Sequence, residues 1–362
     1  MNSVTDSNPV LGVIFHAIGG LAAASFYLPY RRVRGWSWET FWISGGVFSW
    51  LLAPLVAALV LVPGTFAILA AAPGDALFQA WLLGALWGVG GLTFGLSMRY
   101  LGIALGYAVA LGFCAAFGTL VPPLWDGKLA ALAATPAGLW TLAGVGVSLL
   151  GIVFSGAAGL GKEKDITDEQ KRATVAEFSL GKGLVIAGVC GLLSACMSFA
   201  FRAGAPVIET AVAQGTPTLW AALPLLVVIL LGGLTTNLVW CLFLNAKRGT
   251  FGEYAGKAAD GSRAPVARNL AFCAFGGVAW YLQFFFYSMG ESRMGAELKF
   301  SSWTLHMATI IIFSTVWGIL LHEWKGVSAR TRGWVAAGLL VLILSTVLVG
   351  YGNYLGAAGA GH

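Results

Sequence analysis

Charged residues are scarce in this sequence, and their scarcity argues against a soluble globular protein. Only 10% of the 362 residues are Asp, Glu, Lys or Arg, whereas 58% are hydrophobic. A soluble domain typically carries about 25% charged residues. The apolar residues instead form ten blocks of roughly 20 residues, the length that an α-helix needs to cross a hydrocarbon core. We therefore predict an all-α integral membrane protein with ten transmembrane helices.

Signatures of metal sites, disulfide frameworks and enzymes are also lacking. All five cysteines fall inside apolar blocks, and none are paired at metal-ligand spacing. The string Gly156–Glu163 approaches a phosphate-binding loop, but Glu163 stands where Ser or Thr should hold magnesium, and no strand precedes it. We expect a protein that is not an enzyme and has no cofactor or metal. The net charge is +6, but the basic residues lie beside the apolar blocks, where they set membrane orientation. We therefore do not expect nucleic acid as a partner.

The connections between the blocks alternate in charge. The blocks cover residues 9–28, 39–62, 76–98, 100–121, 138–159, 182–202, 219–246, 268–290, 299–321 and 333–354. Seventeen of the 21 Lys and Arg residues lie in the odd-numbered connections; the others are Lys128, Arg202, Arg293 and Lys299. The positive-inside rule assigns the odd connections to the cytoplasm, so both termini should face outward.

The longest hydrophilic stretch divides the ten blocks into five and five. We predict a first repeat over 1–160, a cytoplasmic linker over 161–181 and a second repeat over 182–362. At a constant offset of 171, Gly20 meets Gly191. A weaker alignment, at a different offset, matches Gly88-Val89 with Gly277-Val278. Chance matching of glycine-rich helices is the alternative. Because each repeat has an odd number of spans, the two repeats must insert into the membrane with opposite orientation. Transporters built from inverted repeats bind their substrate near the bilayer midplane, at the interface between the repeats.

Ionisable residues inside the blocks are few, and such residues are functional candidates by default. His16 lies mid-block and His306 several residues into its block; an imidazole titrates near neutral pH. The alternative for each is a neutral histidine bonded to a backbone carbonyl. Glu39 opens the second block, where it could instead cap that helix and favour its positive end. Glu297 precedes the ninth block beside Lys299, where it could instead form an ion pair between helix ends. A desolvated carboxyl could carry a proton, so we take His306, Glu39 and Glu297 as proton-coupling candidates.

An aromatic string in the eighth block surrounds one polar residue. Trp280, Gln283 and Tyr287 share a helical face. Such a stripe usually means core or lipid contact, but Gln283 offers two donors and an acceptor, and the rings offer flat walls that suit a sugar. Trp87, among the glycines of the third block, could form another wall. The predicted substrate-binding residues are His16, Trp87, Trp280, Gln283, Tyr287, Trp303 and His306.

Several strings resemble a known family. They are the stretch around His16, Tyr27–Pro29 running into Arg31–Arg34, Trp36–Thr40, Met98–Gly102, Trp280–Tyr287, and Ser302-Trp303 with Leu305–Met307. With these strings the sequence resembles the bacterial L-rhamnose–proton symporter family of the drug/metabolite transporter superfamily. The resemblance implies ten helices in two inverted five-helix repeats and L-rhamnose uptake driven by inward proton movement rather than by a cofactor. We expect such a protein in the bacterial inner membrane, where the charge pattern gives periplasmic termini.

Two other classes remain as alternatives. The first is an exporter of drugs, amino acids or other metabolites; proton antiport usually needs a carboxylate within a span, and none lies deep in one here. The second is a sensor or scaffold, which the lack of a sizeable soluble domain disfavours. We expect the partners to be a sugar, protons and the lipid bilayer, and the assembly to be a monomer or weak homodimer.

Overall fold

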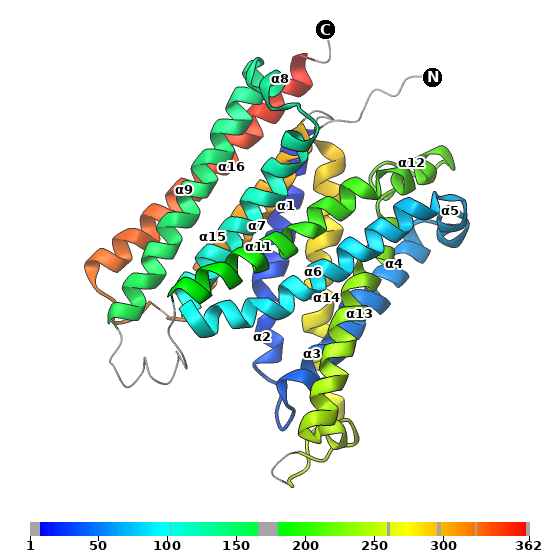
Figure 1. Ribbon diagram of the computed structural model, residues 1–362, viewed down its shortest axis with the longest axis vertical. Coiled ribbons are helices and arrows are strands. Elements are labelled where there is room, and N and C mark those ends of the chain that lie inside the picture. Colours follow the sequence, from blue (N-terminus) through cyan, green and yellow to red (C-terminus); the bar gives the residue numbers. More distant parts are fainter. Residues whose placement is uncertain are drawn as a thin grey trace. The chain divides into compact units, whose positions relative to one another are not determined.

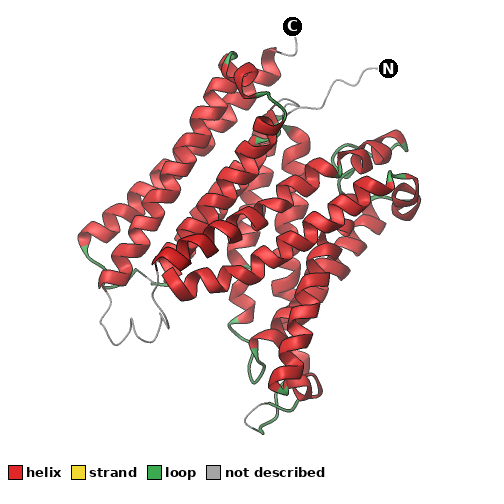
Figure 2. Cartoon of the chain, viewed as in Figure 1, coloured by secondary structure: helices red, strands yellow, loops and turns green. Residues whose placement is uncertain are grey.

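The computed structural model describes residues 8–101, 103–165, 180–258, 261–294, 298–322 and 324–359, and these ranges are almost entirely helical (Figures 1 and 2). Among them the only β-type pairing is an isolated bridge between Lys257 and Arg263. Long apolar runs leave their backbone groups without water, and an α-helix satisfies those groups within the segment. The predicted α-helical class is therefore confirmed.

The helices follow the apolar blocks closely. The long ones are α1 (Pro9–Ser25), α3 (Trp38–Val47) with α4 (Ala53–Leu61), α6 (Gly74–Leu101), α7 (Ile103–Trp125), α9 (Pro136–Asp165), α11 (Leu180–Ala203), α13 (Leu223–Arg248), α14 (Val266–Arg293), α15 (Ser301–Leu320) and α16 (Ala329–Gly359). The short ones are α2 (Tyr27–Tyr30), the π-helical turn η1 (Phe48–Leu52) that joins α3 to α4, α5 (Thr65–Ala71), α8 (Leu129–Ala133), α12 (Ala205–Ala213) and the 3₁₀ turn η2 (Thr250–Ala255).

Nine helical segments within the described residues are long and apolar enough to cross a membrane. The remaining predicted block, 100–121, falls on α7, whose described apolar part, Val109–Trp125, is shorter than a full span. Most of the predicted block boundaries lie within a few residues of the observed helix ends.

Contacts divide the chain into two compact units that do not coincide with the two predicted repeats. Unit 1 contains Met1–Leu21, Gly90–Phe199 and Met289–His362, and unit 2 contains Ala22–Val89 and Ala200–Ser288. Four helices contribute residues to both units: α1, α6, α11 and α14. Each unit thus draws on both halves of the sequence.

In unit 1, α9 and α16 lie side by side along most of their length (Figure 1). Gly144 lies against Val349, and Gly151 lies against Leu342. The partner number falls as the glycine number rises, so the two helices are antiparallel. Such close approach of small residues is how helices associate where apolar burial gives little driving force.

In unit 2, α3, η1 and α4 pack against α13. The turn η1 interrupts the span between α3 and α4: the N–H of Ala53 bonds to the carbonyl of Phe48, five residues earlier. Pro54 follows at the start of α4 and has no N–H with which to restore the α-helical pattern. Turns of this kind occur frequently at functional sites.

Candidate functional site

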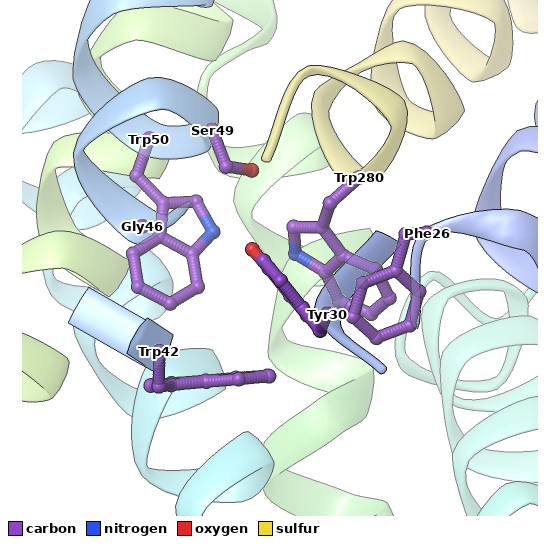
Figure 3. A pocket seen from close by; sticks show the side chains of 7 residues that line it. All are labelled: Phe26, Tyr30, Trp42, Gly46, Ser49, Trp50 and Trp280. Carbon is purple, nitrogen blue, oxygen red and sulfur yellow. The ribbon is translucent and has the colours of Figure 1, made fainter. Parts of the chain in front are cut away.

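An aromatic pocket lies within unit 2 (Figure 3). Its walls come from the α1–α2 junction, α3, η1 and α14, and its lining residues are Phe26, Tyr30, Trp42, Gly46, Ser49, Trp50 and Trp280. The rings of Phe26 and Trp280 lie with centroids 4.2 Å apart. Segments from both ends of the sequence therefore form one aromatic enclosure.

Glycines determine where the aromatic rings of the pocket can lie. The Tyr30 ring is held between Gly45 and Gly276, since a Cβ at Gly276 would lie 2.7 Å from that ring. Trp50 folds back over Gly46 of the preceding turn, where a Cβ would collide with the indole. Any larger residue at these glycines would displace a wall of the pocket.

Polar atoms converge on the middle of the pocket. Figure 3 shows the Ser49 hydroxyl and the indole nitrogens of Trp50 and Trp280 turned toward the Tyr30 hydroxyl. The first three atoms are buried and have no hydrogen-bond partner among the described residues. Trp42 differs, because its indole N–H donates to the Asn237 side-chain oxygen at 2.9 Å. The pocket thus combines apolar walls with buried polar groups that have no protein partner among the described residues.

The predicted aromatic stripe of α14 lies in and beside this pocket. Trp280 lines it, and Gln283 is buried with its amide nitrogen unpartnered among the described residues. Tyr287 packs on Phe201 with ring centroids 5.0 Å apart, and so has a packing contact. Trp87 meets the edge of the Trp50 ring at 6.4 Å between centroids. Trp87, predicted as a wall, therefore contacts Trp50 and is not one of the residues that line the pocket.

The two predicted histidines meet in unit 1. His16 on α1 and His306 on α15 are fully buried, and their ring centroids are 6.3 Å apart. The Thr309 hydroxyl donates to the His16 carbonyl oxygen at 3.0 Å. Gly290 of α14 leaves room for the His16 ring, since a Cβ there would lie 2.8 Å from it. Three helices thus enclose this pair.

Trp303 uses its polar group within unit 1. Its indole N–H donates to the Cys114 carbonyl oxygen at 3.1 Å, and a Cβ at Gly118 would collide with the ring. Its ring also lies 6.3 Å from that of His306, centroid to centroid. This arrangement makes Trp303 a support for the α7–α15 contact beside His306, and its part in substrate binding stays a prediction.

Comparison with known proteins identifies the family. The family model of the L-rhamnose-proton symport protein matches residues 5–355. This chain belongs to that symporter family. An L-rhamnose-proton symporter of Cronobacter sakazakii (strain ATCC BAA-894) is 41% identical over 344 residues, covering 94% of this chain and 97% of the relative. An L-rhamnose-proton symporter of Yersinia pestis (strain Pestoides F) is 38% identical over 344 residues, covering 95% and 98%.

Membership of the L-rhamnose-proton symporter family decides the broad functional class of this protein. The family is one of membrane transporters and not of enzymes, as the sequence predicted. Within the described residues no group of three or more His, Cys, Asp and Glu side chains could hold a metal ion. The residues that concern a symporter are therefore those that meet a solute or a proton.

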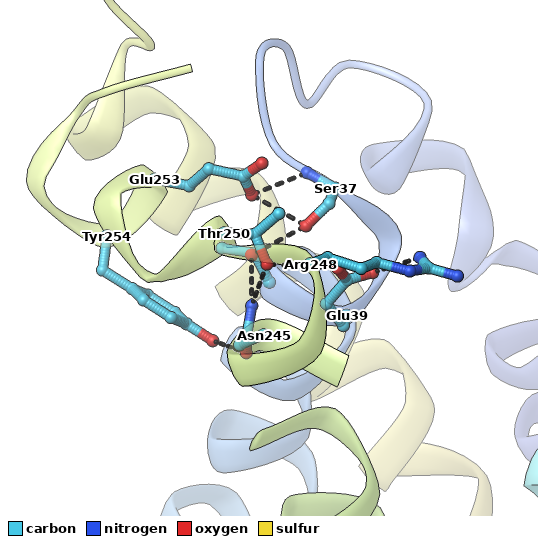
Figure 4. Close-up of polar contacts among 8 residues, drawn as sticks. Ser37, Glu39, Asn245, Arg248, Thr250, Glu253 and Tyr254 are labelled. Atoms are coloured by element: carbon cyan, nitrogen blue, oxygen red, sulfur yellow. Dashed lines mark hydrogen bonds and ion pairs between the residues drawn. The ribbon is translucent and has the colours of Figure 1, made fainter. Parts of the chain in front are cut away.

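The carboxylate candidates of this symporter have different surroundings. Glu39 is fully buried at the start of α3, where Arg248 pairs with it at 3.0 Å and the Thr250 hydroxyl donates to it at 3.1 Å (Figure 4). Its position in the first turn of α3 agrees with the helix-start alternative weighed from the sequence, and the ion pair with Arg248 was not predicted. Glu297 lies outside the described residues.

The polar cluster around Glu39 also contains a residue that the sequence did not single out. Glu253 of η2 accepts hydrogen bonds from the backbone N–H and the hydroxyl of Ser37, at 2.7 and 2.8 Å (Figure 4). It thereby satisfies the start of α3, where helix N–H groups lack partners within the helix. This end of unit 2 is held together by side chains from two separate connections.

Sequence reasoning also missed most of the pocket. Trp42, Gly46 and Trp50 recur every four residues, a spacing that places them along one side of a helix. That spacing was the available signal, but bulky aromatic residues in an apolar block are ordinarily packing residues. Nothing in the pattern announces the π-helical turn that brings Ser49 to the same pocket.

Proposed function

We propose that this protein imports L-rhamnose across the bacterial inner membrane together with protons. The observation that carries the proposal is the full-length match to relatives named L-rhamnose-proton symporter, at 38% and 41% identity. Such a transporter draws its energy from the proton gradient. The exporter alternative has no comparable support, because every reported relative bears the symporter name.

The groups that line the pocket of unit 2 suit contact with one edge of a sugar. A pyranose presents C–H faces that pack on aromatic rings and hydroxyls that need hydrogen-bond partners. Trp280 and Phe26 supply rings, and the donors of Ser49 and Trp50 supply partners. Binding sites of small molecules commonly combine apolar walls with a few placed polar groups. We place Gln283 in the same role, because its buried amide is beside this stripe of α14.

The histidine pair of unit 1 suits the proton. Ionisable groups buried in a membrane are costly, and they mark proton and substrate routes. At 6.3 Å between ring centroids, a charge on one imidazole opposes a second charge on the other. The pair would therefore hold one proton at a time. Glu39 suits this task less well, because Arg248 already neutralises its charge.

Two inverted five-helix repeats are supported by equivalent glycine contacts. Gly20 and Gly191, aligned by sequence, lie against Thr309 of α15 and Ala110 of α7, and these two helices are themselves equivalent as blocks nine and four. Gly88 and Gly277 behave alike: the first lies against α13 and the second against α3, the seventh and second blocks. Chance matching of glycine-rich sequences predicts no such agreement between partners.

The membership of the contact units supports the same repeat. The helices shared by both units are blocks one, three, six and eight, which form two equivalent pairs. Blocks four, five, nine and ten lie wholly in unit 1, and blocks two and seven wholly in unit 2. Equivalent helices α9 and α16 run antiparallel, as an inverted pair would.

The same orientation for both termini is supported within unit 1. Val13, near the start of α1, lies beside Gly350, near the end of α16, with 3.4 Å between the Val13 methyl and a Cβ built at Gly350. The charge pattern then makes that side the periplasm. A tag at the C-terminus should accordingly react with a reagent that cannot cross the membrane.

The function is tested in proteoliposomes with labelled L-rhamnose. Inward proton movement should drive accumulation of the sugar, and a protonophore should abolish it. Replacing Gln283 with Ala should abolish binding, and with it both accumulation and exchange. Replacing His306 with Ala should abolish accumulation but leave exchange of L-rhamnose at equal concentrations. Accumulation that ignores the proton gradient would refute proton coupling, and no exchange of L-rhamnose by wild-type protein would refute the substrate.

A further inference from the structure

The middle of the aromatic pocket has room for about one non-hydrogen atom with its hydrogens. The cavity, which is lined by Tyr30, Ser49, Trp50 and Trp280 together with Phe26, Trp42 and Gly46, measures about 10 Å³. A single water molecule requires roughly 10–15 Å³ measured in this way. A whole pyranose ring does not fit, so this cavity can receive only one substituent of a sugar, either a hydroxyl or a methyl group.

The chemistry of the lining decides between those two groups. The indole N–H groups of Trp50 and Trp280 can only donate hydrogen bonds, and the Ser49 hydroxyl can donate or accept. All three are buried and lack partners among the described residues. A methyl group entering the cavity would leave them unpaired, which is unfavourable in a buried setting. A hydroxyl oxygen has the lone pairs that these donors require.

The π-helical turn explains why neighbouring residues serve one cavity. Ser49 and Trp50 are consecutive, and both line it. In an α-helix consecutive side chains point in clearly different directions, whereas the wider turn η1 holds more residues per turn and reduces that divergence. Pro54 supports the wide turn, because it has no N–H for the regular α-helical pattern. The irregularity of this span is thus a means of aiming two donors together.

We propose that the cavity formed by Ser49, Trp50 and Trp280 anchors one hydroxyl group of the transported sugar. This inference rests on the proposed function. It assigns specificity to residues of the α3–α4 span: the sugar must carry a small oxygen substituent at the anchored position. The remaining hydroxyls are recognised by other groups, so the effect on affinity of removing any of them from the sugar does not depend on this cavity.

The test pairs sugar analogues with protein variants. Binding of L-rhamnose and of each analogue lacking one hydroxyl is measured by calorimetry on purified wild-type, Ser49→Ala, Trp50→Phe and Trp42→Phe proteins. In the wild type, loss of the anchored hydroxyl should weaken binding by about 10- to 100-fold, as expected when buried donors lose their partner. We call the loss of affinity on removing one hydroxyl the penalty for that hydroxyl. In Ser49→Ala and Trp50→Phe the penalty for the anchored hydroxyl should shrink severalfold, while the penalties for the other hydroxyls stay unchanged.

Trp42→Phe is the matched control from the same pocket. Because Asn237 already accepts its indole N–H, this substitution should weaken all the sugars alike and leave every penalty unchanged. Ser49→Ala carries the test if Trp50→Phe does not fold. Methylation of the anchored hydroxyl should abolish wild-type binding, since the cavity has no room for another carbon.

Two results would overturn the anchor. If L-rhamnose binds but every single-hydroxyl penalty is the same in Ser49→Ala as in the wild type, the anchor is wrong and the proposed function stands. If the wild type binds no L-rhamnose, the proposed function fails and the anchor fails with it.

Discussion

Glycine contacts between α9 and α16 allow a stability prediction with an internal control. Gly144 and Gly146 lie two residues apart on α9. A Cβ at Gly144 would lie 2.8 Å from the backbone nitrogen of Val349, whereas a Cβ at Gly146 meets nothing within 4 Å. The backbone of α16 cannot rotate aside as a side chain can. The same substitution, Gly→Ala, should therefore have opposite consequences at two positions within one turn of the same helix.

The magnitude follows from two opposing effects. Alanine is favoured over glycine in a helix interior by roughly 0.5–1 kcal/mol. Overpacking a tightly packed contact costs about 1–3 kcal/mol. Gly144→Ala should thus lose about 1–2 kcal/mol, enough to lower Tm by a few degrees, while Gly146→Ala should leave Tm unchanged or raise it slightly. Thermal unfolding of both purified variants in the same detergent measures the difference. Equal Tm values for the two would refute the close α9–α16 approach.

Two further predictions concern polar groups at helix ends. Replacing Arg248 with Met leaves the buried Glu39 without its ion-pair partner. The free energy of unfolding should fall by about 1–3 kcal/mol, less than for a fully buried pair because Arg248 is half exposed. Lys247→Met is the control: thermal unfolding under the same conditions should show little loss of stability. Hydrogen bonds from the Ser328 N–H and the Thr331 hydroxyl lower the pKa of Asp165 below 3.8. Its stabilisation of α16 should therefore be present above about pH 4 and lost as pH falls further, an acid-side loss of Tm that Asp165→Asn should lack.

The helices were largely predictable because one property determines them. Apolar runs of membrane length must be helical in lipid, and so most of the ten predicted blocks coincide with observed helices to within a few residues. The interruption at η1 was not predictable in this way. Pro54 marks the place, but a proline near mid-span is also tolerated by kinking, and the sequence does not distinguish the two outcomes.

The candidate site was predictable only in part, for a related reason. His16 and His306 were chosen because polar groups are rare in apolar blocks, and the structure brings them together. Ser49 is too small and too common in such blocks to attract notice, and Trp50 resembles a packing residue. What distinguishes Trp50 and Trp280 from Trp42 and Trp303 is whether the indole N–H has a partner. That property depends on three-dimensional neighbours and leaves no trace in periodicity.

One helix, α14, contributes residues to the aromatic pocket and to the surroundings of the histidine pair. α14 contains Trp280 in unit 2 and Gly290, which lies against His16, in unit 1. A ligand biases a conformational equilibrium only through different contacts in the two states. The proposed symport therefore requires that L-rhamnose binding and protonation of the histidine pair favour the same conformation of the transporter.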